Sequence, residues 1–208
     1  MCTSTNNIDL GFTDESFPSG THMCLIYSNE EERIDVIARF LDSGLKTCER
    51  VAYFSDEASA DEVKAWLIEK GIEIPKGKDS KQFSISSTAL TYHPNGKFVP
   101  EEMLETLKAF YNNACNENYP NTRVSGEMSW ALKGIPGSER LMEYESKVNE
   151  VFITHPVTAI CQYDANKFDG ATILECLKVH PFMIVRGQIV RNPYYLKPDE
   201  YLKQLSTS

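Results

Sequence analysis

The sequence has no long hydrophobic run, no leader-like start and no paired cysteine motif. Each absence argues against one class of protein. No apolar stretch approaches the roughly 20 residues that a membrane-spanning helix requires. The first residues, MCTSTNNIDLGF, lack the basic start and the apolar segment of a signal peptide. The six cysteines contain no CxxC pair, which favours small buried thiols in a reducing compartment. We therefore expect a cytoplasmic protein.

Positive charge is also scarce. Lys and Arg together number 21 against 30 Asp and Glu, which leaves a formal net charge of −9. Phosphate backbones and anionic membranes attract Lys and Arg, so this balance argues against a nucleic-acid partner and against membrane docking. The apolar share of 41% and the charged share of 25% are those of a globular protein. A chain of 208 residues suits one domain of ordinary size.

The sequence does contain a regular alternation of strand-like and helix-like segments after a polar N-terminal arm, residues 1–20. Strands are predicted at 22–27, 50–55, 83–88, 122–128 and 157–164, with a strand pair within 182–190. Helices are predicted at 30–45, 60–71, 100–119, 138–153 and 171–179. The alternation predicts βαβ units, and hence an α/β fold with a mainly parallel sheet, in a single domain over residues 21–208.

Acids and aromatics are the residue types expected at the carboxyl ends of these strands. Open parallel sheets bind ligands at that edge, where aromatic rings can line an apolar pocket and a few polar groups can orient the ligand. The candidate ligand-binding residues are Tyr27, Glu57, Glu127, Trp130, Tyr144, Glu145, Tyr163 and His180.

The acidic candidates each have a purely structural alternative. Asp56 and Glu57 precede a helix, where they would form its cap or its acidic first turn. Glu127 would instead form a structural ion pair with Arg123 or Arg140. The sequence leaves these alternatives open.

The remaining candidates also have ordinary structural explanations. Trp130 would be a core residue, and His180 before proline would be a satisfied side chain at the start of a strand. Tyr144 and Glu145 would then be the core face and the solvated face of one helix.

A metal site would use His22, Cys24 and Cys161. His22 and Cys24 alternate along one strand and can point to the same face, and Cys161 lies on another predicted strand. A structural zinc ion needs four ligands, and the sequence alone does not supply a fourth. We therefore expect no metal and no cofactor.

Several long runs of the sequence resemble the MEDS domain, the methanogen and methylotroph sensory domain. These runs are HMCLIYSNEEE, FLDSGLKTCERVAYFSDE, RVSGEMSWALKGIPGSERLMEYESKVN, TAICQYD and KVHPFMIVRGQIVRNPYY. The resemblance extends from His22 to Leu202, which is nearly the whole chain.

The resemblance implies a divergent relative of the RecA and KaiC ATPases, with three layers and a C-terminal β-hairpin. In those ATPases the first strand leads into GxxxxGK[ST], whose backbone cradles phosphates. The corresponding run here, YSNEEERID at 27–35, has neither Gly nor Lys. Its three glutamates would repel a triphosphate at short range. We expect a degenerate phosphate loop and a scaffold that no longer holds ATP.

The resemblance also implies a function. We expect a non-catalytic sensory domain that binds a small organic ligand, such as a one-carbon, methylated or halogenated hydrocarbon derivative. We further expect it to signal to a partner protein such as a histidine kinase or a transcription regulator, as a monomer or homodimer. The alternatives are a residual nucleotide or metal-dependent hydrolase using Asp56, Glu57 and Glu127, and a pure protein–protein interaction module.

Overall fold

A seven-stranded sheet organises the computed structural model, which describes residues 7–207. The strands are β3 (His22–Tyr27), β4 (Arg50–Ser55), β5 (Phe83–Ser87), β6 (Thr122–Glu127), β7 (Val157–Asp164), β8 (Phe182–Val185) and β9 (Gln188–Arg191). Their order across the sheet is β5-β4-β6-β7-β3-β8-β9, and every neighbouring pair is parallel except the hairpin β8–β9. The predicted α/β class, the mainly parallel sheet and the C-terminal hairpin are confirmed.

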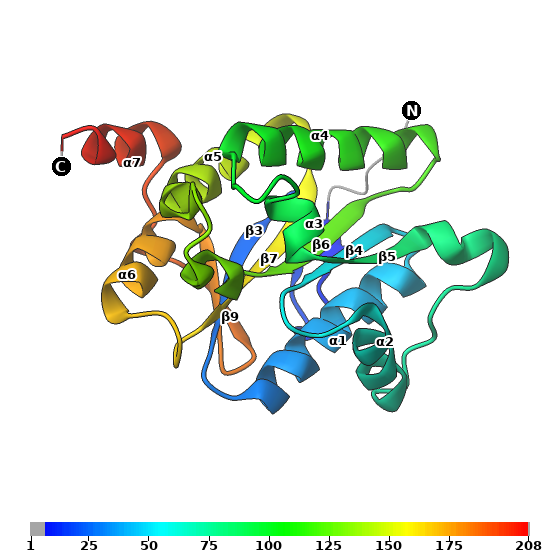
Figure 1. Ribbon diagram of the computed structural model, residues 1–208. Coiled ribbons are helices and arrows are strands. Elements are labelled where there is room, and N and C mark those ends of the chain that lie inside the picture. Colours follow the sequence, from blue (N-terminus) through cyan, green and yellow to red (C-terminus); the bar gives the residue numbers. More distant parts are fainter. Residues whose placement is uncertain (1–6, 208) are drawn as a thin grey trace.

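Helices cover both faces of this sheet and make three layers (Figure 1). One face carries α1 (Glu30–Lys46) and α2 (Ala60–Glu69), and the other carries α4 (Pro100–Asn116), α5 (Leu141–Thr154) and α6 (Gly170–Val179). The predicted helices differ from these mainly at their ends, and α5 is preceded by a separate 3-10 turn, Ser138–Arg140. The short α3 (Thr88–Tyr92) and the terminal α7 (Pro198–Leu205) were not predicted.

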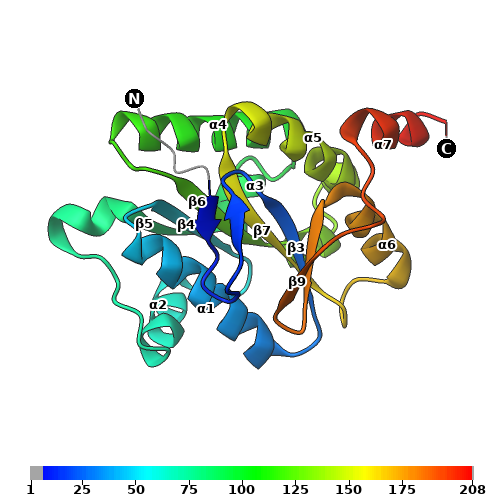
Figure 2. The same ribbon diagram turned by 180° about the vertical axis from the view of Figure 1, so that it is seen from behind.

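The N-terminal arm contains structure that its polar composition did not predict. Strands β1 (Asn7–Asp9) and β2 (Ser16–Pro18) pair antiparallel and lie against the main sheet (Figure 2). Ile8, Leu10 and Phe17 are buried there in the core on the α1 side. Residues 1–6 of the predicted arm lie outside the described residues.

The side chains of successive residues in each strand point into opposite layers, because side chains alternate across a sheet. In β7, Ile160 packs on the α1 side, and Gln162 contacts Arg33 of α1. Cys161 and Tyr163 face the other way and contact α5. Polar residues that are neighbours in sequence therefore lie in different compartments of the molecule.

Candidate functional site

Only two residues, Ser28 and Asn29, join β3 to α1. Asn29 has extended backbone angles, and its Oδ1 accepts from the Glu32 amide at 3.1 Å, which caps the helix. A phosphate loop needs a longer run with glycines, whose free N–H groups point at the phosphates. The turn is therefore too short to form that loop, and the helix cap is supplied by the chain itself.

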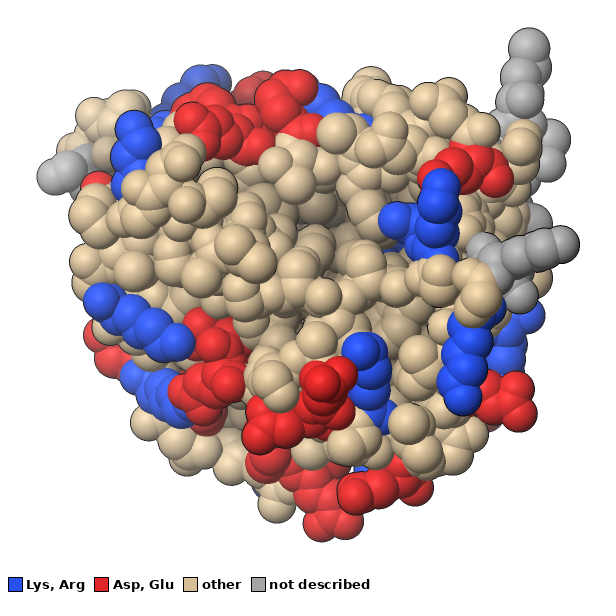
Figure 3. Space-filling model, turned by 45° about the vertical axis from the view of Figure 1, so that its right-hand side comes forward, with Lys and Arg blue, Asp and Glu red and all other residues tan. Residues whose placement is uncertain are grey.

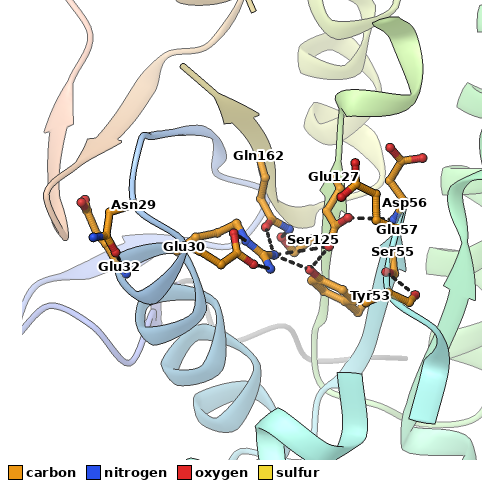
Figure 4. Close-up of polar contacts among 12 residues, drawn as sticks. Asn29, Glu30, Glu32, Tyr53, Ser55, Asp56, Glu57, Ser125, Glu127 and Gln162 are labelled. Carbon is orange, nitrogen blue, oxygen red and sulfur yellow. Dashed lines mark hydrogen bonds and ion pairs between the residues drawn. The ribbon is translucent and has the colours of Figure 1, made fainter. Parts of the chain in front are cut away.

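Arg33 lies where the turn meets the carboxyl edge of the sheet, and its guanidinium gathers polar groups from several strands. It donates to the Tyr53 hydroxyl at 2.8 Å and to Gln162 Oε1 at 2.9 Å. It also lies 3.3 Å from Glu127 Oε1 and donates through Nε to Glu30 at 2.8 Å. Figure 4 shows four of the partners, Glu30, Tyr53, Glu127 and Gln162, converging from α1, β4, β6 and β7. We call these five residues the Arg33 network.

Glu127 is fully bonded within this network. The Tyr53 hydroxyl donates to Glu127 Oε1 at 2.5 Å, and the Asp56 amide donates to Oε2 at 2.8 Å. Burial, followed by the adjoining carboxylate, raises the pKa of Tyr53 far above its usual value, so the phenol stays a donor. Glu127 therefore has no free oxygen directed at a ligand.

Glu127 does form a structural ion pair, which was the alternative to a ligand-binding role, but its partner differs from the expected ones. Its cation is Arg33, not Arg123 or Arg140. Arg123 is wholly buried and pairs with Glu49 at 2.6 Å, and Arg140 pairs with Glu143 at 2.8 Å. The expected partners lie elsewhere because Arg123 begins its strand at the opposite edge and Arg140 precedes α5.

Asp56 and Glu57 do not cap the following helix, which was the structural alternative for them. Ser59 caps α2 with a complete capping box. Asp56 Oδ1 instead accepts from Lys133 Nζ at 2.8 Å. Glu57 is exposed, and its hydrogen bond and ion pair with Lys167 lower its pKa. Both carboxylates therefore have cationic partners.

A second polar group lies on the opposite face of the sheet, between β3, β7, α5 and the end of α6. We call it the Glu145 cluster; its members are His22, Glu145, Cys161 and His180. All are buried, and one ligand-type atom from each lies within 4.8 Å of every other. Glu145 Oε2 is 3.2 Å from His22 Nε2, 3.4 Å from Cys161 Sγ and 3.5 Å from His180 Nε2.

Outer hydrogen bonds fix how each member of this cluster points. The Tyr163 hydroxyl donates to Glu145 Oε1 at 2.9 Å, which leaves Oε2 directed at the imidazoles. His180 Nδ1 is 2.8 Å from the Cys176 carbonyl, which can only accept, so this nitrogen carries the proton. Asn149 uses its amide group on three carbonyls, so its Oδ1 accepts from His22 Nδ1 at 3.2 Å. Both Nε2 atoms therefore face the centre.

The protonation of the cluster follows from burial and from these contacts. Burial opposes the charge on Glu145, but the neighbouring imidazoles of His180 and His22 lower its pKa overall. Burial also opposes a charged His180, yet the Cys24 sulfur and the Glu145 carboxylate raise its pKa to about 9. Burial and the nearby His180 lower the pKa of His22. Burial, then Glu145, raises the pKa of the Cys161 thiol.

A small internal cavity adjoins the cluster. Its volume is about 10 Å³, on the order of the room that one water molecule occupies. His22 and Cys161 form part of its wall, and most of the rest is aromatic or aliphatic. The aromatic lining residues are Phe54, Tyr92, Tyr144 and Phe152. The cavity is thus an apolar chamber with a polar wall.

Comparison with known proteins places these features in a family. Residues 21–181 match the family model described as the methanogen/methylotroph, DcmR sensory domain, or MEDS. The chain belongs to the MEDS family. The transcriptional repressor DcmR of Methylorubrum extorquens is 27% identical over 161 residues, which cover 76% of this chain. The matched region spans only 57% of that repressor.

Solved structures show what fold the MEDS domain shares. A KaiC-like protein from the archaeon Pyrococcus horikoshii OT3 superposes with a TM-score of 0.59 and 18% identity, covering 81% of this chain and 72% of that chain. The flagellar accessory protein FlaH of Methanocaldococcus jannaschii superposes with a TM-score of 0.61 and 16% identity, covering 88% of this chain and 84% of that chain. The expected RecA/KaiC-like fold is confirmed.

The MEDS domain brings together only part of the predicted ligand-binding set. Glu145, Tyr163 and His180 meet in or beside the Glu145 cluster, and Tyr144 lies on the cavity wall. The alternative that placed Glu145 on a solvated helix face is wrong, because its side chain is 0% exposed.

The other predicted residues of the MEDS domain lie apart from the cavity. Tyr27 and Glu127 belong to the opposite face, where the Arg33 guanidinium stacks over the Tyr27 ring at 5.7 Å. Trp130 is a buried core residue that stacks on Tyr92 at 5.1 Å, which was its structural alternative. Glu57 is exposed on the surface. These side chains do not form a single rim.

Sequence reasoning missed Arg33, although a signal for it exists. A cation in the first turn of a helix opposes the helix dipole, so a buried Arg there needs a special partner. Asn149 and Gln162 were also missed, because they bind partners far away in sequence. His22 and Cys161 were considered only as metal ligands, and they prove to line the cavity.

The surface of the MEDS domain offers two further features. A more open groove of about 740 Å³ lies between α5, α6 and α7; its lining includes Glu139, Glu175 and Lys178 but none of the predicted ligand-binding residues. Figure 3 shows acidic and basic side chains intermixed around an uncharged central area. No helix among residues 7–207 has the length and apolar character needed to cross a membrane.

Proposed function

We propose that this MEDS domain is a non-catalytic receptor for a small organic molecule of the one-carbon, methylated or halogenated type. The observation that carries this proposal is the small aromatic chamber walled by His22 and Cys161. Membership of a sensory-domain family and similarity to a repressor make a regulatory role the natural context.

The chemistry of the chamber suits such a ligand. Aromatic rings offer dispersion contacts to halogens and methyl groups, and a single polar wall can orient one dipole. A cavity of about 10 Å³ has room for about one water-sized group, so a ligand with more heavy atoms must displace the close-packed walls, which selects against larger metabolites. The binding site proposed here is therefore the chamber, and not the carboxyl edge that the Arg33 network fills.

We propose a non-catalytic role because each carboxylate suited to hydrolysis has a cationic partner. Asp56 pairs with Lys133 and Glu57 with Lys167, and Glu127 is held by the Arg33 network. Turnover of Mg·ATP that disappears in Glu57→Gln would contradict this part of the proposal.

Filling the chamber tests the receptor function. Ala159 lines the cavity, so Ala159→Val would occupy it with two methyl groups. Ala52→Val is the matched control, because Ala52 is an equally buried strand residue that does not line the cavity. Dichloromethane, methanol and methylamine serve as probes in NMR titrations of the folded chain.

The expected result is saturable binding of at least one probe to the wild type and to Ala52→Val, weakened roughly tenfold or more in Ala159→Val. Absence of saturable binding of every probe at millimolar concentration contradicts the proposal, as does equal binding by Ala159→Val.

We infer further that the occupied domain signals to a protein partner such as a transcription regulator or a histidine kinase. The similar repressor has additional chain beyond the matched 57%, which is consistent with a sensory module linked to an output module. The net charge of −9 and the intermixed surface charges favour a protein over nucleic acid. Light scattering at several concentrations distinguishes the monomer from the homodimer that we expect as alternatives.

A further inference from the structure

We propose that the Glu145 cluster is a closed, four-ligand site for Zn²⁺ or a closely related divalent transition ion. The cluster shares His22 and Cys161 with the chamber wall, but the proposal rests on the cluster's own geometry and not on a ligand in the chamber. The cluster supplies two imidazole nitrogens, one carboxylate oxygen and one thiol sulfur, which are the atom types that Zn²⁺ binds.

The separations between the ligand atoms fit a tetrahedron around such an ion. Bonds of 2.0–2.3 Å from Zn²⁺ to N, O and S place neighbouring ligand atoms about 3.3–3.8 Å apart. Glu145 Oε2 lies 3.2, 3.4 and 3.5 Å from the other three ligand atoms. The fourth recorded edge, from Cys161 Sγ to His22 Nε2, is 3.5 Å. Small shifts suffice to bring the atoms onto one ion.

The same distances are poor for the alternative of a directly bonded carboxylate–imidazolium pair. Charge-assisted N–H···O bonds measure about 2.7–2.9 Å. His22 Nε2 and His180 Nε2 stand 3.2 and 3.5 Å from Glu145 Oε2, and His180 Nε2 makes no well-formed hydrogen bond. An orphaned nitrogen in a fully buried site is costly, and a cation at the centre would satisfy it.

The outer hydrogen bonds have the pattern of a metal site. Metal-bound histidines donate their other ring nitrogen to a carbonyl, carboxylate or similar acceptor, and bound carboxylates are themselves hydrogen-bonded. His180 donates to the Cys176 carbonyl and His22 to Asn149, and Tyr163 holds the second oxygen of Glu145. The four ligand atoms thus point inward before any ion arrives, and the protons that they carry leave as the ion binds.

Charge balance also favours a divalent ion. Cys161 as thiolate and Glu145 as carboxylate carry two negative charges, and two neutral imidazoles add none. A divalent cation makes the group neutral, which removes most of the cost of burying it. Because every ligand is buried, the ion would enter as the chain folds.

A neighbouring group of sulfur and imidazole provides a built-in comparison. Cys24 and Cys176 lie close to His180 Nδ1. That nitrogen, however, is already bonded to the Cys176 carbonyl at 2.8 Å, so it cannot ligate at the same time. Cys24→Ser is therefore the matched control for Cys161→Ser, since both remove one buried thiol from adjacent strands.

The experiment refolds the full chain from denaturant after chelation, with and without Zn²⁺, and measures the bound metal by elemental analysis after desalting. One equivalent per chain is expected for the wild type and for Cys24→Ser. Cys161→Ser should lose at least about tenfold in zinc affinity. Failure of the wild type to retain zinc overturns the proposal, and so does loss in Cys24→Ser with retention in Cys161→Ser.

Cobalt substitution keeps the proposal testable if Cys161→Ser does not fold. Wild-type protein refolded with Co²⁺ should show the intense visible bands of a tetrahedral ion and a sulfur-to-cobalt charge-transfer band. A weak spectrum typical of six oxygen ligands, or no sulfur band, overturns the assignment.

Discussion

At the scale of the single residue, Arg33 shows how one cation holds together the carboxyl edge of the sheet. Its guanidinium bonds to side chains from β4, β6 and β7, and its own side chain is 7% exposed. The charge of Glu127 is compensated only while Arg33 is present. Stability at this edge therefore depends on one cation.

Arg33→Met should destabilise the protein by about 3–5 kcal/mol, because it leaves Glu127 as a buried carboxylate without its cation. Urea unfolding monitored by circular dichroism measures the change. Arg39→Met in the same helix is the control; its ion pair with Asp35 is exposed, so a loss below about 1 kcal/mol is expected.

Adding Glu127→Gln to Arg33→Met should recover at least about 1 kcal/mol relative to the sum of the two single losses, because the unpaired charge is removed. Strict additivity of the two substitutions would mean that the two side chains are not coupled.

Tyr163 is a positioning residue at the same scale. Its hydroxyl holds Glu145 Oε1 so that Oε2 faces the cluster. If the cluster binds zinc as proposed, Tyr163→Phe should weaken zinc about 10–100-fold through this loss of orientation. Competition with a zinc-binding dye gives the affinity, and the far-ultraviolet spectrum checks the fold. An unchanged affinity in a folded variant would show that the phenol does not orient the ligand.

At the scale of the element, the β3–α1 turn changes the reason for expecting no ATP binding. The sequence suggested two reasons, the missing Gly and Lys of the phosphate loop and repulsion by the acidic first turn of the helix. In the structure Glu30 is bonded to Arg33, and Asn29 caps the helix across a two-residue connection. Length and capping, and not charge alone, remove the phosphate cradle.

The two explanations give different outcomes for Glu31→Ala/Glu32→Ala. If geometry decides, this double variant should bind Mg·ATP no better than the wild type, with no saturable heat at millimolar concentration. Isothermal titration calorimetry makes the measurement. A P-loop protein known to bind nucleotides serves as the positive control for the Mg·ATP preparation. If the double variant binds Mg·ATP with micromolar affinity and the wild type does not, charge repulsion is the reason that the wild type fails to bind ATP.

The alternation of strands and helices was enough to predict the strands of the main sheet, helices α1, α2, α4, α5 and α6, and the strand pair around Arg186-Gly187, but not β1, β2, α3 or α7. The site was harder, because it depends on which face of a strand each residue occupies. Glu127 and Tyr163 both end up near the carboxyl edge, but they face opposite layers. His22 and Cys161 meet because β3 pairs with β7, which is distant in sequence, and because the register of this pair places the two residues close together. A single sequence does not contain that pairing explicitly.

At the scale of the whole molecule, the Glu145 cluster joins the layers. Its members come from β3, α5, β7 and the end of α6, so an ion there would link the sheet to the helices above it (Figure 1). An ion that binds only the folded state adds stability through mass action.

Chelation should therefore lower the thermal midpoint. With free zinc at roughly 1,000 times its dissociation constant, the loss is about 4 kcal/mol, which for a domain of this size corresponds to roughly 8–16 °C. Calorimetric scans with and without chelator measure the shift, and Cys161→Ser should show a smaller shift than the wild type because it binds zinc more weakly. Equal midpoints for the wild type in both conditions would argue against a structural ion.

Cys161 and Gln162 are consecutive residues of β7, and their positions have a mechanical consequence. These consecutive residues touch opposite compartments, Cys161 the closed chamber and Gln162 the guanidinium of Arg33. A displacement of β7 by a fraction of an ångström on one side must appear on the other, since a single peptide unit joins them. The first turn of α1 is exposed at Glu30 and Glu31, so a continuous chain of contacts runs from the cavity wall through Gln162 and Arg33 to the outer surface.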